Sequence, residues 1–209
     1  MNFYNLIILD ASGSMCGIRR SALSGCNETI QSIRSAQKNN PGQKQFLTLL
    51  SFNSDEVTHY IFNNQPIEEC KEIKENDYIP DACTPLYDAV GFSIRQLREQ
   101  TKDVKEDKAF LVTIITDGLE NASQHFSQQQ IKSLIEELKP MGWTFAFIGA
   151  NIDEVKEADN IGIHNTMAFC QDEVGTKAMW TNLSKARSKF FDCAQSLSEE
   201  DKENCFFKL

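Results

Sequence analysis

Short apolar runs alternate with amphipathic segments along the chain. Four runs are nearly continuous in Ile, Leu, Val and Phe, which is typical of strands buried on both faces in a helix-covered parallel sheet. A fifth run, Val57–Phe62, is broken by polar residues and follows the polar loop 53–55, which predicts the return strand of a hairpin at the sheet's edge. The four continuous runs are Asn5–Leu9, Phe46–Phe52, Phe110–Ile115 and Trp143–Ile148.

Between these runs, apolar residues recur every three or four positions, so that each segment would place one apolar stripe against a sheet. The third such helix is expected to begin after the N-cap Ser127 and to end before Pro140. A short strand at Thr166–Phe169 and a helix over about Gly175–Phe191 complete an α/β pattern. The three stripes are Leu23, Cys26, Ile30 and Ile33; Leu86, Val90, Ile94 and Leu97; and Ile131, Leu134, Ile135 and Leu138.

One core is expected, because a length of 209 residues suits one domain better than two. Apolar residues make up 41% and charged residues 24% of the chain, which is ordinary globular composition and excludes wholesale disorder. We expect a single domain over residues 1–195 and a polar C-terminal tail over residues 196–209.

The net charge of −9 argues against nucleic acid as a partner, because nucleic-acid binders carry a basic footprint that displaces counterions. Lys and Arg are scattered along the chain rather than clustered. An acidic surface also disfavours docking on anionic lipid. We therefore expect no nucleic-acid and no membrane partner.

The seven cysteines are an odd number without C-x-x-C spacing, which disfavours a zinc site or a secreted disulfide framework. The first apolar run, Leu6–Leu9, is too short for a conventional signal peptide, and no stretch is long enough to span a membrane. These features predict free thiols in a reducing cytosol, and hence a cytoplasmic protein.

The segment Asp10-Ala11-Ser12-Gly13-Ser14 directly follows the first buried run. Its three oxygen-bearing side chains alternate along five residues and meet part of the need of a hard dication for oxygen ligands. Gly13 would let the backbone turn tightly between them. In the alternative interpretation, Asp10 and the serines only cap the following helix.

Two further segments favour the metal site. Asp117 follows the buried run 110–116 and adds a second carboxylate at the carboxyl end of a strand. Thr84 lies in the loop 80–85, just before the helix that starts near Leu86. Neither segment is close to Asp10 in sequence, so the fold must bring them together.

Together the three segments resemble the metal-ion-dependent adhesion site of von Willebrand factor A (VWA) domains, and more specifically the small intracellular bacterial members. The resemblance covers about residues 4 to 170 in the order of motifs and elements, with one departure at Cys83, where the family often has Gly. All five metal-site positions hold the expected residue type. The segments are Asp10-x-Ser12-x-Ser14, Thr84 and Thr116-Asp117-Gly118.

The resemblance implies a Rossmann-like, doubly wound, mostly parallel six-stranded sheet of order 3-2-1-4-5-6, with one antiparallel edge strand and flanking helices. It also implies that Ser12 and Ser14 ligate Mg²⁺ directly, with Mn²⁺ and Ca²⁺ as alternatives. Thr84 would ligate directly in a ligand-bound form and through water in a resting form. Asp10 and Asp117 would supply negative charge, partly through bridging waters. In this strand order, both aspartates lie at the switch point where open α/β sheets bind ligands.

The charge count indicates how such a site works. Two carboxylates balance a dication and three hydroxyls add no charge, so the metal keeps Lewis acidity and an open position. Our hypothesis is that a protein partner supplies a Glu or Asp carboxylate to that position. The chain would then be a metal-dependent protein–protein interaction module, an intracellular adaptor in a multiprotein assembly rather than an enzyme.

The alternative is a magnesium-dependent, phosphatase-like enzyme with Asp10 as nucleophile. Haloacid-dehalogenase-like phosphatases need a second Asp two residues further on as general acid, and Ser12 stands at that position. The sequence shows no nucleophile–base pair beside the other metal ligands, so no catalytic residue is expected.

Overall fold

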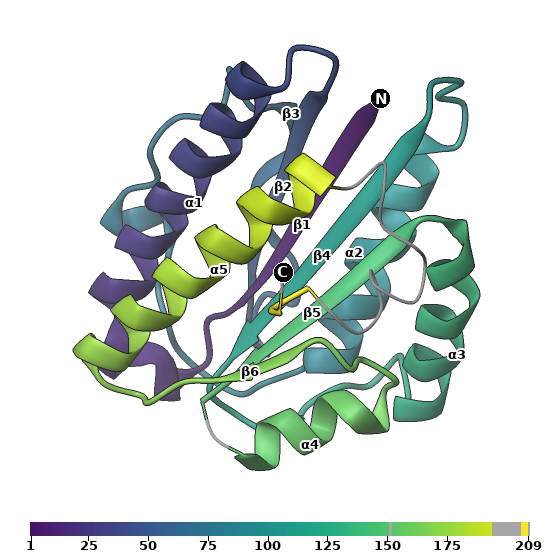
Figure 1. Ribbon diagram of the computed structural model, residues 1–209. Helices are drawn as coiled ribbons and strands as arrows, with labels where there is room; N and C mark the ends of the chain where they lie inside the picture. Colours follow the sequence, from purple (N-terminus) through teal and green to yellow (C-terminus); the bar gives the residue numbers. More distant parts are fainter. Residues whose placement is uncertain (151, 194–205, 209) are drawn as a thin grey trace.

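A six-stranded sheet forms the centre of the computed structural model, which describes residues 1–150, 152–193 and 206–208 (Figure 1). The strand order is β3-β2-β1-β4-β5-β6; β3 runs antiparallel to β2, and all other neighbours are parallel. The fold class expected from the sequence is therefore confirmed. The strands are β1 (Asn2–Asp10), β2 (Lys44–Phe52), β3 (His59–Pro66), β4 (Lys108–Thr116), β5 (Trp143–Gly149) and β6 (Thr166–Ala168).

The central strand β1 is buried along its whole length, which explains its continuous apolar run. Because successive side chains of a strand point to opposite faces, its residues divide between two hydrophobic cores. Phe3, Ile7 and Leu9 pack into the core on one face of the sheet, whereas Leu6 and Ile8 pack into the other. Two buried faces require helices on both sides.

The helices supply those two layers (Figure 1). Helices α1 (Arg19–Asn39) and α5 (Glu173–Cys193) lie side by side on one face. Helices α2 (Leu86–Thr101) and α3 (Gln128–Leu138) cover the other face. The predicted limits of α3 are confirmed, because the Ser127 side chain accepts from the Gln130 backbone N–H and the helix ends before Pro140.

Two elements differ from the expected ones. The edge strand β3 begins at His59 and continues to Pro66, later at both ends than the predicted Val57–Phe62. Its second half is polar because an edge strand is only half-buried, and its register shifts around Asn64, which has a φ of 49°. Helix α4 (Ile152–Asn160) was not predicted, because its nine residues are fewer than a helical period needs to be recognised with certainty.

The predicted polar tail, residues 196–209, falls outside the described residues except for 206–208. Within that short piece, Phe206 is buried, with its ring centroid 5.7 Å from that of Phe190 on α5.

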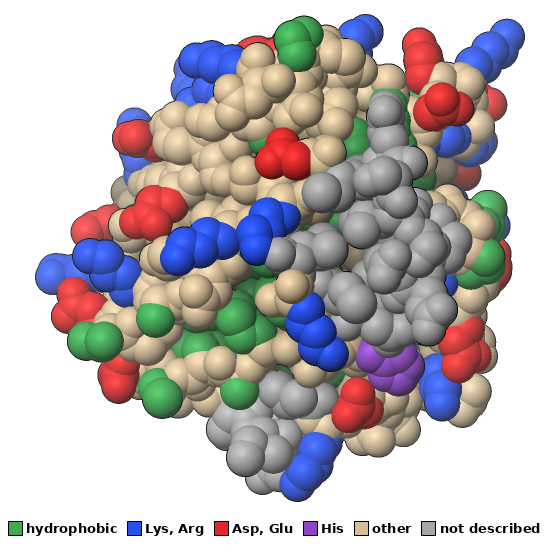
Figure 2. Space-filling view, in the orientation of Figure 1, with side chains coloured by type: hydrophobic (Ala, Val, Ile, Leu, Met, Phe, Trp, Pro, Cys, Tyr) green, Lys and Arg blue, Asp and Glu red, His purple; other side chains and the backbone are tan. Residues whose placement is uncertain are grey.

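The surface is mixed in charge on the face shown in Figure 2, where Lys and Arg side chains alternate with Asp and Glu side chains. The described residues form no broad basic patch on that face. No helix in the described part of the chain has the length and apolar character needed to cross a bilayer.

Close contact between α1 and α5 depends on Gly25. A Cβ atom at this position would lie 2.1 Å from the Trp180 indole, whereas the exposed Gly42 has open space around it. Any larger residue at position 25 must therefore push the two helices apart.

We expect Gly25→Ala to lower the free energy of unfolding by about 1–3 kcal/mol, because overpacking forces helix and ring to shift. Gly42→Ala is the matched control and should change it by less than about 0.5 kcal/mol. Urea unfolding followed by circular dichroism measures both. Equal effects of the two substitutions would contradict the close packing of Gly25 on Trp180.

Candidate metal centre

The carboxyl ends of β1 and β4 lie side by side at one edge of the sheet, the lower edge in Figure 1. Leu9 is in register with Ile115, so the next residues, Asp10 and Thr116, end their two strands side by side. The chain passes from β1 toward β2 on one side and from β4 toward β5 on the other, which makes this edge the switch point of the sheet.

The Asp10 carboxylate is completely buried and is held at both oxygens. Its Oδ1 accepts the Ser12 backbone N–H at 2.7 Å, and its Oδ2 accepts the Thr116 hydroxyl at 2.5 Å. The buried Tyr78 hydroxyl donates to the Asp10 carbonyl at 2.6 Å and holds the backbone as well. Burial raises the pKa of Asp10 to about 6, against the lowering effect of the hydrogen bonds from Thr116 and Ser12.

A chain of hydroxyls links the loop after β1 to Asp117. The Ser12 and Ser14 hydroxyl oxygens lie 3.1 Å apart, and the Ser14 hydroxyl donates to Asp117 Oδ1 at 2.6 Å. Ser14 is exposed, whereas Ser12 and Asp117 are buried, so the group is open to solvent on the Ser14 side.

Thr84 reaches the same place from the loop before α2. The distances from Gly118 locate the Thr84 hydroxyl. A Cβ atom on Gly118 would lie 3.2 Å from Thr84 Oγ1, 3.8 Å from Ser14 Oγ and 3.9 Å from Asp10 Oδ2. Three oxygens from three separate segments therefore surround the space beside Gly118, which any side chain at this position would fill. The structure thus brings together Asp10, Ser12, Ser14, Thr84 and Asp117.

Thr84 is fixed by a reciprocal pair of hydrogen bonds. Its backbone N–H donates to Asn121 Oδ1 at 2.9 Å, and the Asn121 backbone N–H donates to the Thr84 carbonyl at 3.1 Å. Two carboxylates tie the same two segments together: Asp88 accepts three backbone N–H groups of the loop after β4, and Glu120 of that loop accepts one from α2 and two from its own loop. Asp88 accepts from Gln124, His125 and Phe126, and Glu120 accepts from Tyr87, Ala122 and Ser123.

The departure at Cys83 is accommodated by the loop itself. Ala82, one residue earlier, takes up the left-handed conformation with a φ of 64° and so bends the chain before Cys83. Ser54 holds the backbone of Cys83 by two hydrogen bonds. The Ser54 hydroxyl accepts the Cys83 N–H at 3.1 Å, and the Ser54 N–H donates to the Cys83 carbonyl at 3.0 Å.

The donor set suits a hard dication. It offers two carboxylates and three hydroxyls, the oxygen chemistry that Mg²⁺, Mn²⁺ and Ca²⁺ prefer. The described residues contain no group of three or more His, Cys, Asp or Glu side chains placed to hold a metal, so a site at this edge depends on the hydroxyls.

Gln171, from the loop between β6 and α5, contacts the same group of residues. Its side-chain amide donates to Asp117 Oδ2 and, at 3.1 Å, to the Ser14 carbonyl. No sequence pattern marks Gln171, because it lies beyond the motifs and in a short irregular loop. Thr116 and Gly118, in contrast, flank Asp117 and belong to the motif already recognised.

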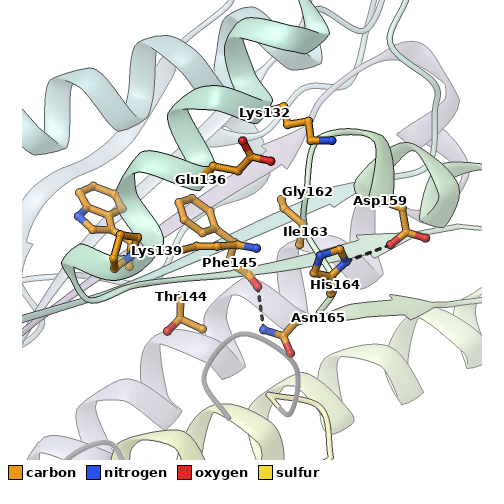
Figure 3. Close-up of a pocket in the computed structure, with 12 residues that line it drawn as sticks. Lys132, Glu136, Lys139, Thr144, Phe145, Asp159, Gly162, Ile163, His164 and Asn165 are labelled. Atoms are coloured by element: carbon orange, nitrogen blue, oxygen red, sulfur yellow. Dashed lines mark hydrogen bonds and ion pairs between the residues drawn. The ribbon is translucent and has the colours of Figure 1, made fainter. Parts of the chain in front are cut away.

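A hollow of about 470 Å³ lies elsewhere in the molecule (Figure 3). It is at the start of β5, the end opposite the five oxygen-bearing residues, and is lined by Lys132 and Glu136 of α3 and by His164, which faces Asp159 at 3.6 Å. None of the five oxygen-bearing residues lines this hollow, so it is separate from the candidate metal centre.

No protein-family description matches the chain, and no curated protein matches it in sequence. Solved structures do match its fold. The PilB minor pilin from Streptococcus sanguinis aligns with a TM-score of 0.64 and 13% identity over 91% of this chain and 62% of its own. The SpRpn10 VWA domain aligns with a TM-score of 0.58 and 10% identity over 86% of this chain and 93% of its own.

A third match is proximal thread matrix protein 1 from the mussel byssus, with a zinc-occupied metal-ion-dependent adhesion site; the TM-score is 0.57 and the identity 13%, over 87% of this chain and 46% of that protein. The chain thus spans less than two thirds of the pilin and of the byssus protein. At these identities the matches establish architecture alone. The chain has the α/β fold of VWA domains.

Proposed function

We propose that this chain is a protein–protein interaction module. Its binding of a partner would depend on one divalent cation, held at the edge of the sheet where Asp10 and Asp117 lie. The observation that carries the proposal is the convergence of Thr84, Ser14 and Asp10 oxygens on the space beside Gly118. When bound, the cation would supply Lewis acidity, and a Glu or Asp of the partner would fill its open position. Mg²⁺ is the expected ion, with Mn²⁺ and Ca²⁺ as alternatives.

Each residue has a distinct part in this proposal. Ser12, Ser14 and Thr84 would offer hydroxyl oxygens to the cation, and Asp10 and Asp117 would balance its charge. Thr116 and Asn121 would act as positioning residues, because they hold Asp10 and Thr84 and need not touch the cation.

Exposed apolar side chains on the surrounding loops support a role in binding protein. Ile79 precedes Thr84 in its loop, Leu119 follows Gly118, and Val174 lies in the first turn of α5, three residues after Gln171. Their exposed fractions are 61%, 49% and 80%, respectively. A partner could cover these side chains while its acidic residue meets the cation.

The phosphatase alternative is less well supported by this geometry. A nucleophilic aspartate must reach its substrate, yet Asp10 is fully buried with both carboxylate oxygens engaged. We therefore propose that the chain is not an enzyme. We also propose that it works as an adaptor in a reducing compartment such as the bacterial cytoplasm, since Cys16, Cys26, Cys70, Cys83 and Cys170 are free thiols.

Titration of Mg²⁺ or Mn²⁺ into chelator-treated protein tests the metal site. We expect saturable binding of one ion, lost in the Asp10→Ala, Ser12→Ala double variant and retained in Ser133→Ala on the exposed side of α3. Capture of a protein partner should then require the cation and fail in the double variant. Metal binding that survives in the double variant would refute the assignment.

Asn121→Ala should weaken Mg²⁺ binding about tenfold, because Thr84 loses the acceptor that fixes its backbone. Asn121→Asp keeps an acceptor oxygen and should bind at least as tightly as the original chain. Calorimetry on both variants provides the comparison. An unchanged affinity in Asn121→Ala would show that Asn121 does not position Thr84 for the cation.

Asp10→Asn should separate metal binding from stability. Since the pKa of Asp10 in the metal-free protein is raised to about 6, this group favours folding below pH 4, and the contribution is lost as the pH rises through 6. At pH 7 in chelator, Asp10→Asn should therefore leave the free energy of unfolding unchanged or raise it by about 1–2 kcal/mol, while metal binding is abolished.

Urea unfolding in chelator at pH 5 and pH 7 measures this effect, and the gain from Asp10→Asn should shrink at pH 5, where Asp10 itself is largely protonated. A clear loss of stability in Asp10→Asn at pH 7 would contradict a buried carboxylate that is costly without its cation.

A further inference from the structure

Gln171 lies outside the motif, yet its side chain contacts two of the candidate cation-binding residues, Ser14 and Asp117. Both of its contacts, the Asp117 carboxylate and the Ser14 carbonyl, can only accept hydrogen bonds. The amide nitrogen rather than the amide oxygen must therefore face the site. A neutral donor thus takes the place beside Asp117 where a cation would supply positive charge.

The side chain lies on the solvent side of the site. Gln171 is exposed, whereas the aspartate that it contacts is only 7% exposed. Ser14, its other contact, is the exposed member of the five oxygen-bearing residues. An ion or a partner carboxylate approaching from solvent would meet this carboxamide.

The loop that carries Gln171 is firmly held. Asp172 caps α5, with its Oδ1 accepting the Gly175 N–H at 2.6 Å and its carbonyl accepting the Thr176 N–H at 2.9 Å. The chain folds so tightly here that a Cβ atom on Gly175 would lie 2.4 Å from the Cys170 carbonyl oxygen. This packing fixes the position from which Gln171 reaches Asp117.

From these contacts, and resting on the proposed metal-dependent function, we infer that Gln171 is an internal competitor for the cation. In the metal-free protein its amide donates to Asp117 and helps to hold the site together. Binding of the cation requires this hydrogen bond to break, because the cation and the amide N–H compete for the same Asp117 carboxylate. Gln171 thereby sets the threshold of ion concentration at which the site fills.

The test is calorimetric titration of Mg²⁺ alone, and of Mn²⁺ alone, into chelator-treated variants. Gln171→Ala should bind the ion about two- to tenfold more tightly, the worth of one net hydrogen bond. Gln171→Glu should gain at least about tenfold, because a third carboxylate then faces the dication. Gln100→Glu, at the far end of α2, adds the same charge about 20 Å along that helix and should change affinity less than about twofold.

Two further readouts test the placement of Gln171. In chelator, Gln171→Glu should unfold at lower urea concentration than Gln171→Ala, because the new carboxylate faces Asp117 without a cation between them. Gly175→Ala should tighten ion binding as Gln171→Ala does, because it displaces the loop and leaves the carboxamide unchanged.

The outcomes separate the two proposals. Ion binding that is unchanged or weaker in Gln171→Ala, with normal binding in the original chain, overturns the competitor role and leaves the metal site standing. Absence of ion binding in the original chain and in every variant overturns both.

Discussion

The aligned ends of β1 and β4 bring two carboxylates, Asp10 and Asp117, to one edge of the sheet. The residues around them must offset the free-energy cost of holding these two negative charges close together. Asp10 is buried, so its charge is costly, as its raised pKa of about 6 reflects. Thr116, the Ser12 backbone and Ser14 each donate to one of the two carboxylates, and Gln171 adds a further donor. These neutral donors reduce the repulsion between the carboxylates without cancelling their charge. A dication at the same place would cancel it, and the chemistry of the edge therefore favours a metal.

The same constraint links stability to function. A buried, charged carboxylate lowers the stability of the fold, and the rest of the molecule must compensate for that cost. Burial of β1 on both faces and the close approach of α1 to α5 at Gly25 are two sources of that compensation. Near Asp10 and Asp117, the side chains of Asp88 and Glu120 hold the loop after β4 to the start of α2 by hydrogen bonds. Because both loops are held in this way, the Thr84 hydroxyl lies beside Gly118, the residue that follows Asp117.

Much of this arrangement could be predicted from the sequence, for identifiable physical reasons. The four central strands are largely buried on both faces and so are nearly continuously apolar. Helix α3 has both a capping residue and a proline just after its end. The five oxygen-bearing residues follow a spaced motif whose segments the α/β topology brings together. Helix α4 could not be predicted, because its nine residues are too few to establish a helical period. The limits of β3 were shifted because an edge strand tolerates polar residues. Asn121 and Gln171 act through contacts with residues 37 and 54 positions away, and such contacts leave no periodic trace in the sequence.

The most direct measurement is the anomalous diffraction of crystals grown from chelator-treated protein and soaked in Mn²⁺. One anomalous peak is expected beside Gly118, at about 2.0–2.3 Å from the Ser12 and Ser14 hydroxyl oxygens. The Gln171 amide should then have left Asp117. A peak elsewhere in the molecule, or no peak beside Gly118 while Gln171 still contacts Asp117 at saturating Mn²⁺, would contradict a metal-dependent function at this edge.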